Sequence, residues 1–224
     1  MDTKLIVTPK FKDICLNRKP VSTTHIRENE EHIDFKDIRL YMDTFRKQNL
    51  NFLEILFTDY FIIPSAYFDE WMRLVEHREE IARMNPCRAV QSMRGVALQK
   101  YYAMEHPYPS KIALLEKYGY DGKQVHHLLR VQDYLKRYIA GESYEACLKP
   151  SPEIIDRLIA YKRQEIPLDI ARKEAAMAID DVDHIALGFC TQVEEQEDEN
   201  MRNLLEDVSC NIMKISYFIH FYHL

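Results

Sequence analysis

The spacing of the apolar residues changes from a strand period to a helix period near residue 37, and this change constrains the fold most. Residues 31–36 alternate between apolar and polar side chains, as in a half-buried strand. Residues 3–8 are rich in β-branched side chains and predict another short strand. Beyond Asp37, which suits a helix N-cap, apolar residues recur at helical spacing. The sequence therefore predicts a short strand region followed by a mainly helical chain.

Proline and glycine divide the helical part into segments. Residues 11–29 are mixed and polar, and we expect a connecting loop or a short helix there. Helices are predicted over 38–45, 68–84, 86–105, 109–118, 121–140, 151–164, 167–187 and 194–219, with a dense apolar run at 50–57. The fold class is α+β, mostly α. Because two strands alone do not make a stable sheet, we expect them to pack on the helices or to belong to a sheet whose other part is missing from this chain.

Composition bounds the function classes. The chain has 224 residues, which suit one large domain or two small ones, and a net charge of −6. That charge argues against nucleic-acid binding driven by overall charge, although it is compatible with a local basic patch. With only five glycines, a glycine-rich phosphate loop is poorly supported.

The sequence also bears on the compartment. No apolar stretch approaches the ~18–20 residues that span a bilayer, and the N-terminal segment lacks the pattern of a signal peptide. The five cysteines are scattered and form no CxxC pair, which indicates reduced thiols rather than a disulfide framework or a zinc site. We therefore expect a cytoplasmic protein with no membrane contact.

Two aspartates are candidates for chemistry in the strand region. Asp34 lies on the polar side of the second strand, and a carboxylate fixed on a strand suits metal coordination or base catalysis. The alternative is a solvated surface aspartate beside Lys36. Asp2 immediately precedes the first strand, and its alternative is a disordered terminal residue.

The helix at 121–140 contains a cationic stripe. Lys123, His127 and Arg130 stand at i, i+4 and i+7 and therefore share one helix face. Three such groups suit a polyphosphate or a carboxylate. The alternative is a solvated basic face with one packed histidine.

Two stretches of the chain resemble a known family. They are residues 31–60, which contain Asn51, Phe52, Glu54, Leu56 and Phe57, and residues 119–142, which contain Gly119, Tyr120, Asp121, Lys123, His127 or its neighbour His126, and Arg130. Together they resemble the predicted nucleotidyltransferases of the DNA polymerase beta superfamily, in the RNA-repair-associated branch of bacteria and phages. The order and spacing of several motifs make the resemblance specific, and it covers nearly the whole chain.

The resemblance implies a fold, an activity and a site. It implies a partial nucleotidyltransferase α/β domain over 1–60, built on a remnant of the family's mixed sheet, and a helical domain over 61–224. The activity would be magnesium-dependent transfer of a nucleotide from a nucleoside triphosphate to an RNA or protein acceptor, with two metal ions around the α-phosphorus. Asp2 and Asp34 would bind the metal and act in catalysis, and Lys123, His127 and Arg130 would bind the nucleotide.

The chain departs from the family pattern at its beginning. Such enzymes have a Gly-Ser pair and an Asp-x-Asp pair, but this sequence contains no Gly-Ser and only the second aspartate of the pair, Asp2. We therefore expect impaired transfer, with a catalytically inactive nucleotide- or RNA-binding module as the alternative and a helical adaptor as a third hypothesis. An open sheet edge would also favour homo-oligomers.

Overall fold

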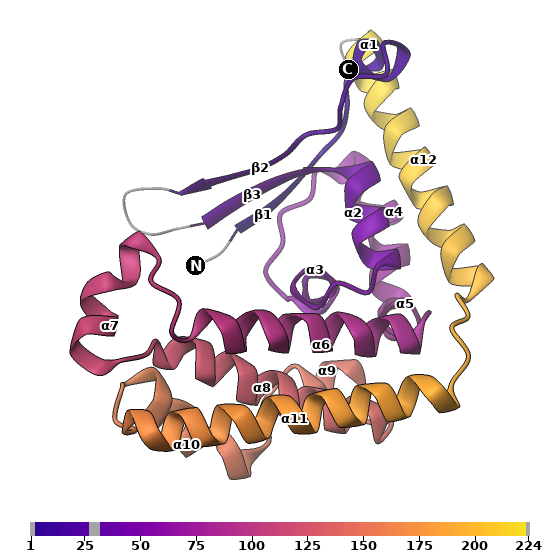
Figure 1. Ribbon diagram of the computed structural model, residues 1–224. Coiled ribbons are helices and arrows are strands. Elements are labelled where there is room, and N and C mark those ends of the chain that lie inside the picture. The colour runs from indigo at the N-terminus through magenta and orange to yellow at the C-terminus, as the bar shows by residue number, and fades with distance from the viewer. Residues whose placement is uncertain (1–2, 27–31, 223–224) are drawn as a thin grey trace. The chain divides into compact units, whose positions relative to one another are not determined.

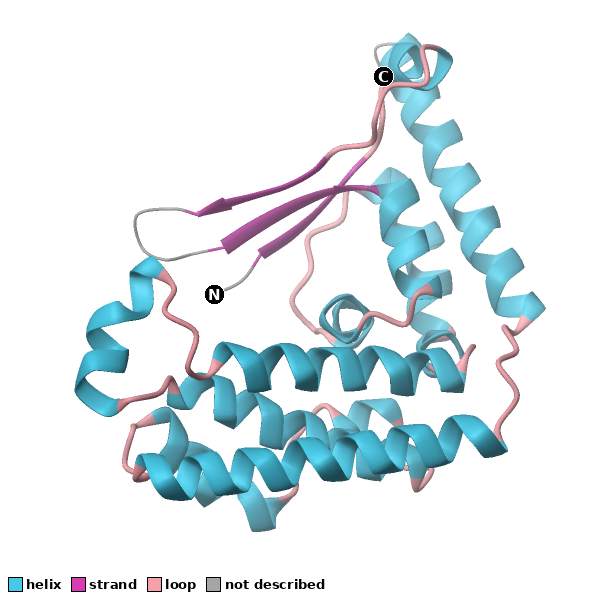
Figure 2. Cartoon of the chain, viewed as in Figure 1, coloured by secondary structure: helices cyan, strands magenta, loops and turns pink. Residues whose placement is uncertain are grey.

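The computed structural model describes residues 3–26 and 32–222, and helices dominate it (Figure 2). In chain order the elements are β1 (Thr3–Val7), α1 (Phe11–Cys15), β2 (Ser22–Ile26), β3 (His32–Asp37), α2 (Ile38–Arg46), α3 (Leu50–Leu53), the 3-10 helix η1 (Glu54–Phe57), α4 (Ser65–Glu76), α5 (Arg78–Ala82), α6 (Pro86–Ala103), the 3-10 helix η2 (Pro109–Lys111), α7 (Ile112–Tyr118), α8 (Gly122–Ile139), α9 (Tyr144–Cys147), α10 (Pro152–Lys162), α11 (Leu168–Gln192) and α12 (Glu199–Tyr222). The expected class, α+β and mostly α, is confirmed.

The chain divides into two compact units. Unit 1 contains Met1–Asn85 and Glu197–Leu224, and unit 2 contains Pro86–Gln196. The boundary expected between residues 60 and 61 falls inside unit 1. Unit 1 is discontinuous because the C-terminal helix α12 packs on α2 and α4, which precede unit 2 in the chain (Figure 1).

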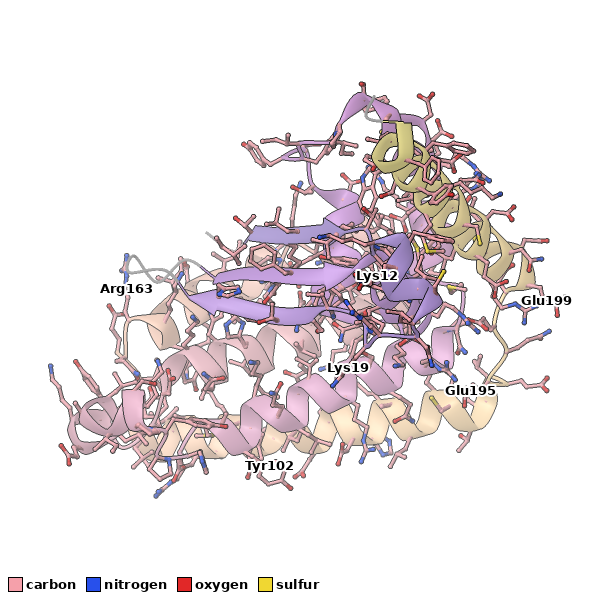
Figure 3. All side chains as sticks on the ribbon, turned by 90° about the horizontal axis from the view of Figure 1, so that it is seen from above. Lys12, Lys19, Tyr102, Arg163, Glu195 and Glu199 are labelled. Carbon is pink, nitrogen blue, oxygen red and sulfur yellow. The ribbon has the colours of Figure 1, made fainter. Side chains whose placement is uncertain are left out.

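Unit 1 contains a three-stranded mixed sheet with the order β1-β3-β2 (Figure 1). The central strand β3 is parallel to β1 and antiparallel to β2. Strand β2 corrects the expectation of a loop or short helix over 11–29, where the chain forms α1 and then a strand. That segment lacks an apolar–polar alternation, so only its pairing with β3 reveals it. Lys12 and Lys19, on the segment between β1 and β2, are exposed (Figure 3).

Helix α2 is the centre of the unit 1 core. Ile38, Tyr41 and Phe45 are fully buried on it. The expected cap is confirmed, since a carboxylate oxygen of Asp37 accepts from the backbone N–H of Arg39 at 3.0 Å. At the other end, the guanidinium of Arg46 donates two hydrogen bonds of 2.9 Å to the carboxylate of Glu197, just before α12.

The helix predicted over 68–84 is interrupted. Helix α4 ends at Glu76 and α5 begins at Arg78, because His77 between them has φ −103° and ψ 20°, outside the helical region. No proline or glycine marks this break, so the periodicity of the sequence runs through it. The neighbouring prediction, a helix that begins at Pro86, is confirmed by α6.

Unit 2 is a helical bundle. Helix α8 packs on α6, α10 and α11, and its Val125, Leu128 and Leu135 are fully buried. The short helix α9 was not expected, and it follows Gly141, which has φ +87° and ends α8 as predicted. Among the described residues, no helix combines the length and the apolar composition that crossing a membrane requires.

Candidate functional site

Several residues of the segment 119–130 fix the position of the start of α8. Gly119 has φ +79° and ends α7 in the left-handed conformation. The hydroxyl of buried Tyr120 donates to the carbonyl of Ile166 at 2.6 Å. A Cβ on Gly122 would lie 2.1 Å from the carbonyl oxygen of Tyr161, so α8 approaches the end of α10 at a distance that only glycine permits. These motif residues therefore have structural roles.

Asp121 is the N-cap of α8. Its carboxylate is 4% exposed, accepts from the backbone N–H of Lys123 at 3.0 Å and forms an ion pair of 3.2 Å with Lys111. A buried carboxylate with these two partners fixes the start of α8, and its negative charge interacts favourably with the positive end of the helix dipole. Asp121 thus fixes the backbone at Lys123, which follows in the first turn.

The structure separates the three predicted nucleotide-binding residues into two roles. Lys123 is exposed and His127 is half-buried on α8. The guanidinium of Arg130 instead donates to the carbonyl of Leu148, just after α9, at 3.0 Å. Arg130 therefore supports the packing of α9, and Lys123 and His127 remain available for a ligand.

A third cationic residue, Lys100, lies on α6, which packs on α8. It is half-buried, and its charge acts on both Lys123 and His127. We name Lys100, Lys123 and His127 the α8 cluster. Among the described residues, neither lysine of the α8 cluster has a carboxylate within salt-bridge distance. Sequence reasoning did not single out Lys100, because α6 meets α8 only through the tertiary fold.

The pKa values in the α8 cluster respond to burial and to like charge. Burial, and after it the nearby charges of His126, Lys100, Lys123 and Arg130, together lower the pKa of His127 to about 4. The pKa of Lys100 is lowered by burial first and then by Lys123, against the opposing effect of Asp121. At neutral pH His127 is therefore an uncharged imidazole among cations, and an anion would relieve the repulsion between them.

The two neighbouring histidines differ in role. Nδ1 of His126 lies 3.0 Å from the carbonyl oxygen of Leu158, so His126 links α8 to α10. His127 contacts the His126 ring edge to face, with centroids 5.2 Å apart. Of the two candidates for the motif histidine, His127 is the one in the α8 cluster.

Asp34 lies on β3 in the row formed by Lys4, Asp34 and Thr24 across the sheet. One carboxylate oxygen accepts from the Thr24 hydroxyl at 2.6 Å, and the other accepts from the Lys4 ammonium at 3.2 Å. The Thr24 hydrogen bond is the main cause that holds the pKa of Asp34 below its usual value, followed by the opposing effect of burial and then by Lys4. Asp34 is therefore an ionised carboxylate with both oxygens engaged. The other expected metal ligand, Asp2, lies outside the described residues.

This environment does not match a two-magnesium site. Magnesium requires several oxygen ligands in octahedral geometry, often carboxylates, but a lysine ammonium lies beside the Asp34 carboxylate. Within residues 3–26 and 32–222, no group of three or more His, Cys, Asp and Glu side chains is arranged to hold a metal. The donor set of the described residues does not fit the metal that the resemblance implies, so we derive no step through it.

The side chains of Asn51–Phe57 mainly provide packing contacts within unit 1. Leu53 and Leu56 are buried in the core of unit 1. Glu54, which stands between them, is exposed. The Phe52 ring lies beneath Lys4 and Lys36 of the sheet. The stretch thus supplies core contacts and an aromatic surface for the sheet.

Comparisons with known proteins assign no family to this chain. No protein-family model, no curated protein and no solved structure matches it. The likeness to nucleotidyltransferases therefore remains a hypothesis from its sequence motifs, and the function is argued from the site.

Proposed function

We propose that this chain binds a nucleoside triphosphate and that the α8 cluster binds its polyphosphate. The observation that supports this most directly is the pair Lys100 and Lys123, two cations from different helices with no carboxylate partner among the described residues. Two like charges close to each other, one of them on the half-buried Lys100, are unfavourable unless an anion neutralises them. A polyphosphate supplies several negative oxygens for such donors.

His127 extends this anion site. Its pKa of about 4 makes it neutral at physiological pH, so it contributes a hydrogen bond rather than a charge. A bound polyphosphate would favour the protonated ring and raise this pKa. Binding of an anion and protonation of His127 are therefore linked.

The wider hypothesis is that the chain acts as a nucleotidyltransferase. Magnesium-dependent transfer to an RNA or protein acceptor is the reaction that the sequence motifs imply. The engaged oxygens of Asp34 favour binding without transfer in the arrangement described. The nucleotide- or RNA-binding module is therefore the form of the proposal that the geometry supports best.

Isothermal titration with ATP, with and without magnesium, tests the binding site. Lys123→Met keeps the aliphatic stem and removes the charge, so we expect its affinity for ATP to fall at least ~10-fold, the loss of a charge-assisted contact. Lys117→Met is the matched control, because Lys117 is an exposed lysine of α7 in the same unit. Equal affinities of Lys123→Met and the unchanged protein, or no ATP binding at all, would contradict the proposal.

Transfer is measured separately. Release of pyrophosphate, together with label from α-labelled ATP on an RNA or protein acceptor, would establish the enzyme. Binding without pyrophosphate release would establish the binding module. Loss of transfer in Asp34→Asn without loss of ATP binding would return Asp34 to the catalytic site.

Two further expectations belong to this proposal. The five cysteines are all free thiols, which supports a cytoplasmic location because that compartment keeps thiols reduced.

Strand β1 pairs only with β3 within the described sheet, and an unpaired strand edge favours pairing with a second copy. Sedimentation velocity over a concentration range tests this association, and a monomer at all concentrations would contradict it.

A further inference from the structure

Two lysines of unit 1 lie over the same aromatic ring. The Lys36 ammonium of β3 is 3.6 Å from the centroid of the Phe52 ring, and the Lys4 ammonium of β1 is 4.6 Å from it. Lys4 also forms the ion pair with Asp34. We name Lys4, Lys36, Tyr41 and Phe52 the sheet-face cluster.

The N–H donors of the Lys36 ammonium are not satisfied by the described residues. It is half-buried, and among the described residues its ammonium has neither a hydrogen-bond acceptor nor a carboxylate within salt-bridge distance. Burial lowers its pKa, Asp34 opposes this effect, and Lys4 adds to it. Its contact with Phe52 is favourable, but the ring supplies no oxygen acceptor for the three N–H donors.

Tyr41 adds a second unused donor. Its side chain is fully buried, and its hydroxyl has no hydrogen-bond partner within the described part of the chain. Burial raises the pKa of Tyr41, and the negative charge of Asp34 raises it further, so the hydroxyl stays protonated at neutral pH. The Tyr41 ring lies 5.9 Å from the Lys36 ammonium and 5.5 Å from the Phe52 ring. A buried hydroxyl without a partner is unfavourable, and a ligand oxygen would satisfy it.

The chemistry of these groups selects a class of ligand. The two ammonium groups of the sheet-face cluster, together with the Asp34 carboxylate paired with Lys4, leave a net positive charge, which disfavours a metal cation. The Lys36 ammonium and the Tyr41 hydroxyl are unused donors, and the Lys4 ammonium, which makes one hydrogen bond to Asp34, has further N–H donors, so the ligand must supply acceptor oxygens. Three donor side chains, from β1, β3 and α2, suit the several oxygens of a tetrahedral oxyanion better than the two of a carboxylate.

We propose that Lys4, Lys36 and Tyr41 form a phosphate-binding site over Phe52 on the face of the sheet. This site is independent of the α8 cluster and does not rest on nucleotide binding there. Its ligand is a free phosphate or the phosphate group of a small phosphomonoester.

Inorganic phosphate is the probe, and its affinity is measured by isothermal titration. In the full chain carrying Lys123→Met, which weakens the α8 cluster, we expect phosphate to bind as in the unchanged protein. Lys36→Met keeps the stem over Phe52 and removes the charge, so we expect affinity to fall at least ~10-fold, while Lys36→Arg retains most of it. The matched control is Lys12→Met, because Lys12 is an exposed lysine of α1 in the same unit and is not among the charges that act on Lys36.

Tyr41→Phe separates a ligand contact from a structural role. Removing a buried hydroxyl that has no partner should leave stability unchanged or raise it, and the lost donor should weaken phosphate binding several-fold. Stability is followed by urea denaturation, which also shows that each variant folds. Phosphate binding that is unchanged in Tyr41→Phe and Lys36→Met, or no phosphate binding at millimolar concentration, would overturn the proposal.

Adenosine monophosphate distinguishes the two sources of phosphate. If it binds more tightly than inorganic phosphate and depends equally on Lys36, the ligand is a phosphomonoester. If inorganic phosphate binds more tightly with the same dependence, the ligand is free phosphate. Binding of both probes that depends on Lys123 and not on Lys36 would refute the site.

Discussion

The close approach of α8 to α10 makes a sharp prediction about Gly122. In Gly122→Ala the new Cβ would lie 2.1 Å from the Tyr161 carbonyl oxygen and 2.7 Å from Oε1 of Gln164. The glutamine can rotate away, but the backbone carbonyl is fixed at the end of α10, so the helices must separate. Overpacking of this kind costs about 3 kcal/mol, at the upper end of the usual range. For a unit of this size, that loss corresponds to a decrease in Tm of roughly 10 °C.

The measurement is urea denaturation followed by circular dichroism, with thermal unfolding as a second readout. Gly95→Ala is the matched control, since a Cβ at Gly95 in α6 would have no atom within 4 Å. Alanine is favoured over glycine within a helix by up to ~1 kcal/mol, so this control should be slightly stabilised. If Gly122→Ala is as stable as the unchanged protein, the proposed contact between α8 and Tyr161 is wrong.

Three further predictions concern unit 2. Because the pKa of His127 is lowered from 6.5 to about 4, the unfolded chain binds more protons than the folded chain between these pH values. The free energy of unfolding should therefore fall as the pH decreases through this window, by up to about 3 kcal/mol. His127→Gln should lack this part of the pH dependence when urea denaturation is compared at pH 7 and pH 4.5. Asp121→Ala removes the cap of α8 and leaves Lys111 without its partner, so it should lower the free energy of unfolding by about 2 kcal/mol, and an unchanged urea midpoint would contradict that role. Burial, then the neighbouring Cys190, raises the pKa of the Cys87 thiol to about 11, so iodoacetamide should modify Cys87 far more slowly than exposed Cys15, as peptide mass spectrometry would show.

The local signals of the sequence predicted many element ends correctly. Asp37 caps α2, Pro86 opens α6, Gly119 ends α7 and Gly141 follows α8. Each of these residues acts through its own backbone preference or through a hydrogen bond within its own turn. Such effects depend on neighbouring residues alone, so they can be recognised without the fold.

The candidate sites were only partly predictable. The helical spacing of Lys123 and His127 placed them on one face, and the structure retains that relation. Arg130 shares the spacing, but its guanidinium binds the Leu148 carbonyl, a partner 18 positions away in the sequence. The carboxylate of Asp34 is likewise defined by Lys4 and Thr24 on other strands.

The sequence by itself determined the helical character of the chain, the N-terminal strands and most helix boundaries, because these depend on periodicity and on local capping. Only the tertiary structure decided that β2 completes the sheet, that α12 belongs to unit 1, and that the charge of Lys100 acts on His127. Each of these relations joins segments far apart in the chain, and their stability comes from burial and pairing across the fold rather than from any local preference.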